Sequence, residues 1–417
     1  MEDPMSHRPT RSKHTALQQV CNLIPPYLVA KLARKHDVDK RARTFSPWSH
    51  VVSLLYAQLV HAIGLNDICD GLANHAAKLL CVRNATPPKR NTLSHANKVR
   101  DAKMAEDLFW SVLHHLTHLH PRFGGRTFGG FPRRFKRVIN IVDATTIQLV
   151  ANCIDWARHR RRKAAAKMHL GLNLQSFLPR FAIIDTARQS DSKRARELCA
   201  RMDGGEIVLF DKAYVDFKHL FELTQRGVFW VTRAKDNMRC RCRQRLLGKP
   251  TGNILRDDLI VLECDKSRGN YPEVLRRVVA IVEVDGKDTV MTFITNNLEW
   301  SPASIVDLYQ CRWSIEVFFK QIKRTLQLCD FLGHSKNAIL WQVWMALLLY
   351  TLLRFLGFSN EWRHSFKRLF CVVRSLVWDG MELVSLLKSY GTAGGVPRVR
   401  ATPEQAYFPG FMHRPAT

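Results

Sequence analysis

The sequence of 417 residues predicts a mixed α/β protein preceded by an all-helical segment. Two observations support this prediction. Residues 1–120 carry apolar side chains at helical spacing and no run of strand signals. After the glycine pairs at 124–125 and 129–130, short apolar segments typical of strands alternate with polar segments typical of helices.

The helical segment contains several expected helices. Residues 17–24 have helical spacing and end at a proline pair, and residues 51–63 form an apolar run with Ser49 as a possible N-cap. A basic linker, residues 86–91, leads into a polar helix that starts at Thr92, and a further apolar helix is expected over residues 105–116. We therefore expect residues 1–120 to form a separate helical module.

Strands are expected next, and two of them stop at an aspartate. The expected strands are residues 138–142, 169–174, 181–184, 206–210 and 228–231, and the helices between them are 193–202 and 217–224. Asp143 follows the first strand and Asp211 the fourth. An aspartate after a strand commonly caps a helix or forms a turn, so each alone has a structural explanation.

The C-terminal half is expected to contain a β-rich insertion and then long helices. Strands are predicted at 259–262, 278–284 and 290–295, and a helix should run from Pro302 to about Leu328. The expected divisions are a first part of the α/β core (135–237), the β-rich insertion (238–300), the C-terminal helices of the core (301–390) and a flexible basic tail (391–417). The apolar run 338–353 contains Gln342 and is shorter than the roughly 20 residues of a membrane span, so we expect a buried helix and no membrane partner.

The charge balance points to a polyanionic partner. Lys and Arg number 64 against 36 Asp and Glu, a formal net charge of +28, which is not typical of an acidic or neutral metabolic enzyme. Nucleic acid is the favoured polyanion and a membrane surface the competing one. The polar N-terminus shows no secretory signal, and eleven scattered cysteines suit free thiols in a reducing cytoplasm.

A third acid joins the two aspartates in the helix after Pro302. At 100° per residue, Tyr309, Arg312, Glu316 and Lys323 fall within an arc of about 60°, beside an apolar stripe formed by Ile315, Phe318, Ile322 and Leu326. Arg312 and Glu316 could also be a simple surface ion pair. Three carboxylates from two strand ends and a helix suit two Mg²⁺ ions, which would activate water and stabilise a leaving 3′ oxygen. We expect the three carboxyl groups to converge within about 4 to 8 Å.

These residues resemble the signature of DDE transposases of the bacterial insertion-sequence type 4 family. The resemblance is carried by the spacing from Tyr309 to Lys323 and by the segments that begin at Asp143, Lys167, Asp211, Phe229 and Phe331. It implies an RNase H-like fold interrupted by a β-rich insertion, and a DNA-binding or accessory role for the helical module of residues 1–120 in front. It also implies that Asp143, Asp211 and Glu316 are catalytic and hold two Mg²⁺ ions, for which Mn²⁺ can substitute.

The resemblance further implies DNA partners and an assembly. Tyr309, Arg312 and Lys323 would act around the scissile phosphate, and a homodimer would pair the two terminal inverted repeats before they join target DNA. Such an enzyme would be cytoplasmic and associated with the nucleoid. One departure is Lys212-Ala213, where many relatives have Arg-Gly. A nuclease without strand transfer and a DNA-binding protein derived from a transposase stay open as alternatives.

Two basic segments are further DNA-binding candidates. Residues 158–163 include Arg158, Arg160, Arg161, Arg162 and Lys163, although a charge run is often only a solvated loop. On a strand, alternation would place Arg239, Arg241, Arg243 and Arg245 on one face, where they could follow a DNA backbone. The histidines of residues 114–120 and the pair Cys240 and Cys242 have no role that the sequence assigns, and zinc binding has little support.

Overall fold

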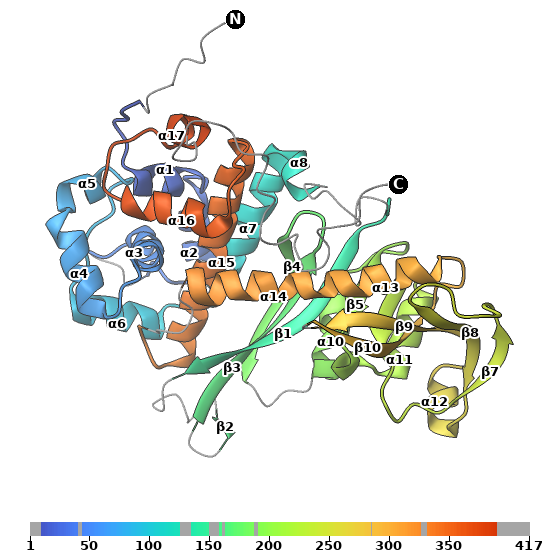
Figure 1. The fold of residues 1–417 in the computed structure, drawn as a ribbon. Coiled ribbons are helices and arrows are strands. Elements are labelled where there is room, and N and C mark those ends of the chain that lie inside the picture. The colour runs from blue at the N-terminus through green and yellow to red at the C-terminus, as the bar shows by residue number, and fades with distance from the viewer. Residues whose placement is uncertain are drawn as a thin grey trace, which may run out of the picture. The chain divides into compact units, whose positions relative to one another are not determined.

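The computed structural model describes residues 10–40, 44–125, 135–149, 158–160, 163–186, 191–284, 286–326 and 332–389. The chain divides into two compact units. The helical unit comprises Met1–Gly124, Ile147–Ala165 and Val317–Thr417, and the sheet unit comprises Gly125–Thr146 and Ala166–Glu316. The expected mixed α/β architecture, with a large sheet and many helices, is confirmed (Figure 1).

The helical unit packs its N-terminal helices against helices from the C-terminal part of the chain. The central helix α15 contacts α3, α6, α7 and α16 (Figure 1). The helices of this unit are α1 (Ala16–Asn22), α2 (Leu28–Lys35), α3 (Pro47–Val60), α4 (Leu65–Asn74), α5 (Ala76–Leu80), α6 (Arg90–Val99), α7 (Lys103–Leu119), α8 (Pro121–Gly124), α15 (Lys336–Ser359), α16 (Phe366–Ser375) and α17 (Leu383–Ser389).

Local sequence explains where the two apolar helices of this unit begin. Ser46, not the expected Ser49, caps α3, because its side chain accepts a hydrogen bond from the backbone N–H of Ser49 and Pro47 occupies the first helical turn. Ser335 caps α15 in the same way. By length and composition α15 could cross a membrane, but 89% of its most apolar window is buried inside the structure. Its burial is that of a core helix, as expected.

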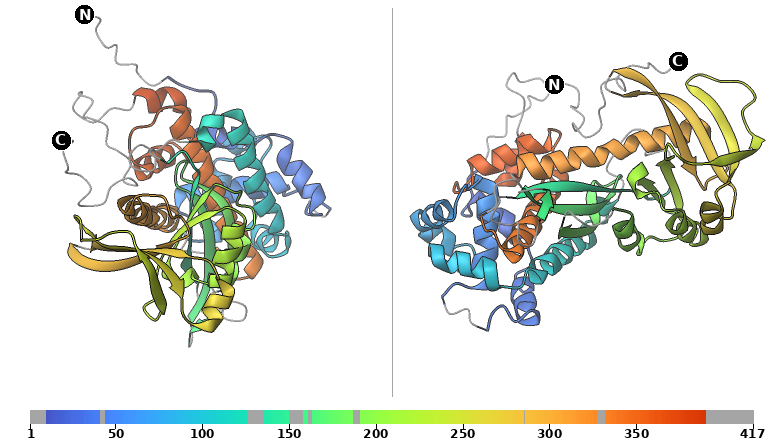
Figure 2. Two further views of the ribbon diagram at one scale, coloured as in Figure 1. Left: turned by 90° about the vertical axis from the view of Figure 1, so that its right-hand side faces the viewer. Right: turned by 90° about the horizontal axis from the view of Figure 1, so that it is seen from below.

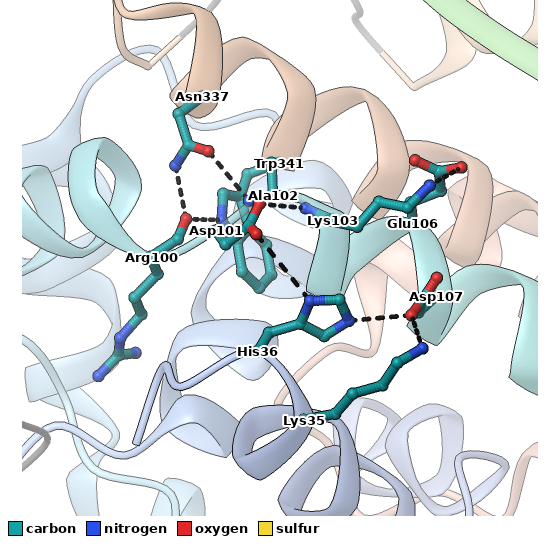
Figure 3. A network of polar contacts seen from close by, with 10 residues as sticks. All are labelled: Lys35, His36, Arg100, Asp101, Ala102, Lys103, Glu106, Asp107, Asn337 and Trp341. Atoms are coloured by element: carbon teal, nitrogen blue, oxygen red, sulfur yellow. Dashed lines mark hydrogen bonds and ion pairs between the residues drawn. The ribbon is translucent and has the colours of Figure 1, made fainter. Parts of the chain in front are cut away.

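A polar network fixes the turn between α6 and α7 (Figure 3). The amide of Asn337 on α15 donates to the carbonyl oxygens of Asn97 and Arg100, and its oxygen accepts from the N–H of Ala102. Trp341 donates from its indole to the same Arg100 carbonyl over 2.7 Å. The carbonyl groups at the end of α6 are therefore satisfied by side chains of α15 rather than by water.

The sheet unit is built on one large sheet with the strand order β2-β3-β1-β5-β6-β10-β9-β8-β7, in which β4 pairs with β3. Figure 2 shows helices over both faces of this sheet. The strands are β1 (Ile139–Leu149), β2 (Arg158–Arg160), β3 (Lys163–Asn173), β4 (Leu178–Thr186), β5 (Ile207–Phe210), β6 (Phe229–Arg233), β7 (Cys240–Arg245), β8 (Ile254–Leu262), β9 (Leu275–Val284) and β10 (Lys287–Thr295).

The centre of the sheet consists of three parallel strands, β1, β5 and β6. On one face, side chains such as Val142, Phe210 and Trp230 pack against α10 (Asp191–Cys199) and α11 (Phe217–Gln225) in a buried core. The other face is in contact with α13 (Pro302–Gln310), which packs on β6, β8, β9 and β10. Since side chains alternate along a strand, odd-numbered residues of these three strands face α13.

The expected β-rich insertion continues this sheet. β10 pairs antiparallel with β6, and β9, β8 and β7 follow it outwards, with the short helix α12 (Asp265–Asn270) between β8 and β9. Strands of residues 238–300 are therefore hydrogen-bonded into the same sheet as the parallel strands, although they come later in sequence.

The helix after Pro302 begins as expected but is not regular. Ser301 caps α13, and Pro302 lies in its first turn. The helix then tightens into a 3₁₀ turn, η4 (Cys311–Trp313), continues as α14 (Ser314–Lys320) and ends in a π-helical turn, η5 (Gln321–Thr325). The apolar stripe is confirmed, since Ile315, Phe318, Ile322 and Leu326 are all fully buried.

Candidate active site

The two candidate aspartates lie on neighbouring parallel strands at matching positions. The register pairs Ile139 with Ile207 and ends at Val142 with Phe210, so Asp143 and Asp211 are the next residues of these two neighbouring segments, with Asp211 just past the end of β5. Neighbouring strands are about 4.8 Å apart, and paired residues share a face. The two carboxylates therefore stand side by side on the face of the sheet that α13 covers.

The prediction that the first strand ends at Asp143 is wrong. β1 continues through Asp143 to Leu149. Only the hydrogen bonding of the sheet could reveal this, because an aspartate after an apolar run resembles a strand end in sequence. One carboxylate oxygen of Asp143 accepts from the backbone N–H of Ala144 over 2.7 Å. The side chain is held within a strand and does not cap a helix.

Asp211 does follow its strand directly, but its side chain does not form a cap. It precedes the 3₁₀ turn η3 (Lys212–Tyr214) without any side-chain capping hydrogen bond. Its Oδ1 instead accepts from the hydroxyl group of Tyr309 on α13, over 3.4 Å. The turn-forming explanation for Asp211 is therefore not supported, and its carboxylate faces Tyr309 on α13.

Arg312 is the centre of the site. Its side chain is 9% exposed, and its Nη1 lies 2.8 Å from Oδ2 of Asp143 while its Nη2 lies 3.7 Å from Oε1 of Glu316. Burial by itself would lower the pKa of Arg312, but Tyr309 and all three candidate carboxylates raise it. One guanidinium group thus experiences Asp143, Asp211 and Glu316 together. The pair of Arg312 and Glu316 is part of this cluster and not an isolated surface ion pair.

Tyr309 connects the acids to the sheet. Its ring packs on Phe293 of β10 with centroids 5.0 Å apart, and burial raises the pKa of its hydroxyl group to about 12. The phenol therefore stays protonated at neutral pH and can donate to Asp211. Arg233 acts in the opposite direction on this pKa, which places its positive charge close to the same hydroxyl group.

Arg233 was not among the site residues expected from the sequence. The register of β5 with β6 pairs Phe210 with Thr232, so Asp211 is followed in the next strand by Arg233. Asp143, Asp211 and Arg233 hence form a row across three adjacent parallel strands. The sequence contains a pattern that points to this row, because a charged residue follows or ends each of the three apolar strand segments. Arg233 also lines a cavity of about 230 Å³ together with Lys235 and Arg277.

Glu316 and Lys323 do not lie on one regular helical arc with Tyr309 and Arg312, although the sequence predicts one. Glu316 is 48% exposed in α14 and is the last residue of the sheet unit. Lys323 lies in the π-helical turn η5 and belongs to the helical unit, where burial lowers the pKa of its amino group. The 3₁₀ and π-helical turns change the angle per residue, so a single regular helix with these four side chains on one arc is not present.

The acidic residues suit a hard divalent cation chemically. Carboxylate oxygens are the ligands that such ions prefer, and a guanidinium cation now lies between two of the three acids. Within the described ranges, no three His, Cys, Asp or Glu side chains come close enough together to hold one ion. The expected convergence of three carboxyl groups on a cation is therefore not found among these residues, and Arg312 provides the positive charge beside Asp143 and Glu316.

The four arginines near β7 do not share one face. All four are exposed. The pairing with β8 shifts between Cys242 and Gln244, so Arg243 is the extra residue of a β-bulge and Arg245, opposite Asp258, lies on the same face as Cys242. The expectation of four guanidinium groups in a row is therefore wrong, because the bulge reverses the alternation. Arg239 and Arg241 keep the face opposite to that of Cys240.

The remaining candidates are only partly described. Arg158 and Arg160 belong to the short edge strand β2 and Lys163 begins β3, but Arg161 and Arg162 lie outside the described residues. Cys240 accepts a hydrogen bond from Arg277 over 3.4 Å, and burial raises the pKa of its thiol. His114 and His118 stack on α7 with ring centroids 6.4 Å apart.

Comparisons with known proteins identify the family to which the chain belongs. Residues 134–352 match the family model of the transposase DDE domain, and residues 12–81 match a family described as a domain of unknown function. A Sinorhizobium fredii protein named as a transposase is 29% identical over 279 residues, which is 66% of this chain and 77% of that protein. A Geobacillus stearothermophilus protein, named as a probable transposase of an insertion sequence, is 27% identical over 54% of this chain and 58% of its own length.

A solved structure gives a weaker likeness. The piggyBac transposase in a synaptic complex with hairpin DNA aligns with a TM-score of 0.42 and 10% identity, over 86% of this chain and 77% of that one. That score is too low to compare the two folds in detail.

Proposed function

Because this chain belongs to the DDE transposase family of the insertion-sequence type 4 group, we propose that Asp143, Asp211 and Glu316 form its active site. The family acts in DNA transposition. For this chain, the reaction we propose is cleavage at the ends of an insertion sequence followed by transfer of the freed strand to target DNA. One observation carries this proposal: the strand register brings Asp143 beside Asp211, and Arg312 experiences both together with Glu316.

The sheet supports an RNase H-like core as part of the proposal. Three parallel strands carry the two aspartates, helices cover both faces, and the third acid comes from a helix after the β-rich segment (Figure 2). Antiparallel strands follow β6 and join the sheet before that helix begins. This order is the one that the family resemblance implies for an interrupted catalytic core.

The three carboxylates would hold two Mg²⁺ ions, with Mn²⁺ as a possible replacement. Members of the family generally use divalent metals. When bound, such ions supply Lewis acidity for the attacking water and for the leaving 3′ oxygen. Asp143 and Asp211 come from the rigid centre of the sheet, whereas Glu316 comes from an exposed helical turn. We therefore assign the two aspartates as the fixed ligands and Glu316 as the adjustable one.

Arg312 would change its partner during the reaction. In the structure its guanidinium group lies beside the carboxylates of Asp143 and Glu316. A scissile phosphate carries negative charge and accepts bidentate hydrogen bonds from a guanidinium group. With cations on the carboxylates, Arg312 would bind that phosphate, and Arg233 from the same row of the sheet would support it. Tyr309 would hold Asp211 in place through its protonated hydroxyl group.

Both chemical steps replace one phosphorus–oxygen bond with another. In cleavage, the oxygen of a water molecule bonds to phosphorus, the bond to the 3′ oxygen breaks, and that oxygen takes up a proton. In strand transfer, the new 3′ hydroxyl group loses its proton and attacks a target phosphate, whose own 3′ oxygen leaves and is protonated. In-line displacement at phosphorus needs positioning and charge neutralisation, which these side chains provide.

The DNA contacts and the assembly complete the proposal. DNA is the partner that the family indicates. The exposed arginines 239, 241, 243 and 245 would contact the DNA backbone, as would the segment 158–163 and Lys323. A homodimer would pair the two element ends, and the enzyme would act in the bacterial cytoplasm on the nucleoid.

A gel assay with paired element ends and a target duplex tests the function. We expect strand-transfer products with Mg²⁺ or Mn²⁺ and none with EDTA. Cleavage without joined products would identify a plain nuclease and contradict transposition. A mobility shift without any cleavage, under conditions that saturate the DNA, would identify a DNA-binding protein instead.

A further inference from the structure

Helix α6 presents an outer face that no other described element covers. Its exposed polar residues fall within an arc of about 140° at 100° per residue. They are Arg90, Asn91, Ser94, His95 and Lys98, and Lys89 precedes them as the N-cap residue. Val99, the last residue of the helix, is an exposed apolar residue beside them. The helix contains no acidic residue. In the part of the chain that the structure describes, none of the three cations has an ion-pair or hydrogen-bond partner.

The inner face of α6 packs on α15 and α4 and is hydrogen-bonded to α3. Nε2 of His50 on α3 lies 2.8 Å from Oδ1 of the buried Asn97, and the His50 ring packs 4.5 Å from the ring of Trp341. Asn337 and Trp341 bind the carbonyl groups at the end of the helix (Figure 3). The guanidinium group of Arg100 donates to carbonyl groups just before α3. The helix is therefore fixed in rotation and position.

We propose that the outer face of α6 is a sequence-reading surface for double-stranded DNA. The proposal rests on the proposed function, since the DNA to be read would be the end of the element. Asparagine, serine and histidine side chains can donate to and accept from base edges, and the lysines and arginine suit phosphates. A rigid helix that carries base-reading residues flanked by cations has the features that readout in a groove requires.

The dimensions of α6 agree with the major groove. A helix of ten residues is about 15 Å long, and the major groove of B-DNA is about 12 Å wide and admits one helix. Asn91 and His95 are four residues apart, on adjacent turns of one face, so they can meet successive base pairs. Lys89 and Arg90 at one end and Lys98 at the other would contact the phosphates on either side.

The first test measures DNA affinity by fluorescence anisotropy without divalent metal, so that catalysis does not enter the readout. The probes are a duplex from the end of the element and a duplex of the same composition with a shuffled sequence. We expect the full-length chain to prefer the element end. The triple variant Asn91→Ala, Ser94→Ala, His95→Ala should lose at least about tenfold in affinity for that end and keep its affinity for the shuffled duplex.

Cation variants separate phosphate contacts from base contacts. Lys98→Gln should lower the affinity for both duplexes and reduce the steepness of log affinity against log salt by about 1. Lys31→Gln on α2 is the matched control, because Lys31 is also an exposed lysine on a helix of the same unit. It should leave both affinities and the salt slope unchanged. Thermal unfolding of every variant should match the wild type, since all substituted side chains are exposed.

Three outcomes would overturn the proposal. They are an unchanged preference for the element end in the triple variant, a wild-type chain without any such preference, and tighter binding of this face to anionic phospholipid vesicles than to DNA. The catalytic proposal is tested separately by cleavage: loss of cleavage in acid variants with normal binding leaves the role of α6 standing.

Discussion

Two arginine–aspartate pairs of the sheet unit, Arg276–Asp257 and Arg312–Asp143, differ in how completely their hydrogen-bonding groups have partners. Arg276 and Asp257 are each 5% exposed and joined by two hydrogen bonds of 2.8 and 2.7 Å, and Arg276 also donates to the carbonyl groups of Leu298 and Trp300. Arg312 makes one hydrogen bond of 2.8 Å to Asp143, and its Nε, although buried, has no hydrogen-bond partner among the described residues.

The difference separates a structural pair from a functional one. A bidentate pair with its remaining donors bound has no capacity for another ligand, and breaking it would leave a buried charge uncompensated. Arg312 has spare donors, a second carboxylate at 3.7 Å and aromatic rings of Tyr309 and Trp313 about its guanidinium group. Its arrangement can be exchanged for a phosphate and cations, which a catalytic site requires.

The largest expected effect is on catalysis by the acids. Asp143→Asn, Asp211→Asn or Glu316→Gln should each lower the rate of DNA cleavage by about a thousandfold or more, because on our proposal several kcal/mol of charge stabilisation depend on metal ions that these carboxylates would hold. A cleavage assay with labelled element ends measures this, and anisotropy checks that DNA binding persists. Retained cleavage in any one variant would remove that residue from the site.

The second effect contrasts the stability of the two pairs. Asp257→Asn should lower the free energy of unfolding by about 3 to 5 kcal/mol, since it leaves Arg276 charged and buried. Asp143→Asn should cost less, because Arg312 keeps Glu316 and the charge of Asp211. Urea unfolding of both variants measures the difference. Equal losses would mean that the two pairs have the same structural role.

The third effect tests Arg312 in catalysis. Arg312→Gln removes the charge that we assign to the scissile phosphate, so the cleavage rate should fall about a hundredfold or more. Arg312→Lys keeps the charge without the planar fork and should recover only part of the activity. Arg276→Lys is the control for a general effect of arginine loss, and its activity per folded molecule should be near that of the wild type.

In the helical unit, His50 is another buried side chain with only part of its hydrogen-bonding capacity used. Nε2 of His50 has Asn97 as a partner, whereas Nδ1 is buried without one, and burial lowers the pKa of His50 to about 3. Between pH 6.5 and 3 the unfolded chain binds more protons at this residue than the folded chain, so stability falls as pH decreases. One such group changes the free energy of unfolding by about 1.4 kcal/mol per pH unit in this range. Urea unfolding at several pH values should show a smaller slope for His50→Gln, and an equal slope would contradict the neutral buried state.

The smallest effect concerns Tyr309. Its hydrogen bond to Asp211 is long, at 3.4 Å, so Tyr309→Phe should cost only about 1 kcal/mol, a several-fold loss of cleavage rate. Because the pKa of Tyr309 is raised to about 12, both enzymes should have the same pH–rate profile below pH 9. A difference in profile there would show that the hydroxyl group ionises during the reaction.

The sequence predicts the parts of this site that depend on local pattern. The apolar stripe from Ile315 to Leu326 follows from helical spacing, and the start of α13 follows from Ser301 and Pro302. The pairing of Asp143 with Asp211 does not, because it depends on hydrogen bonds between strands 68 residues apart in register. The charged row was visible only as three separate strand ends, so Arg233 could not be assigned.

Irregular backbone explains the other differences. The bulge at Arg243, the 3₁₀ turn that contains Arg312 and the π-helical turn that contains Lys323 each break the regular period of their element. One such change alters the direction of every side chain beyond it. Patterns with a fixed period therefore predict the core of this protein better than they predict its charged surfaces.

The continuous sheet fixes the distance between Asp211 and the arginines of β7. From Asp211 on β5 to the arginines of β7 there are five strand-to-strand steps, which at about 4.8 Å each amount to about 24 Å. That length corresponds to about seven base pairs of DNA. A nuclease footprint should hence show protection beginning at the cut and extending at least this far along one side of the duplex. Because hydrogen-bonded strands cannot slide past one another, the fold fixes this distance. The number of strands between Asp211 and β7 would then set the position of the cut relative to the outer DNA contact.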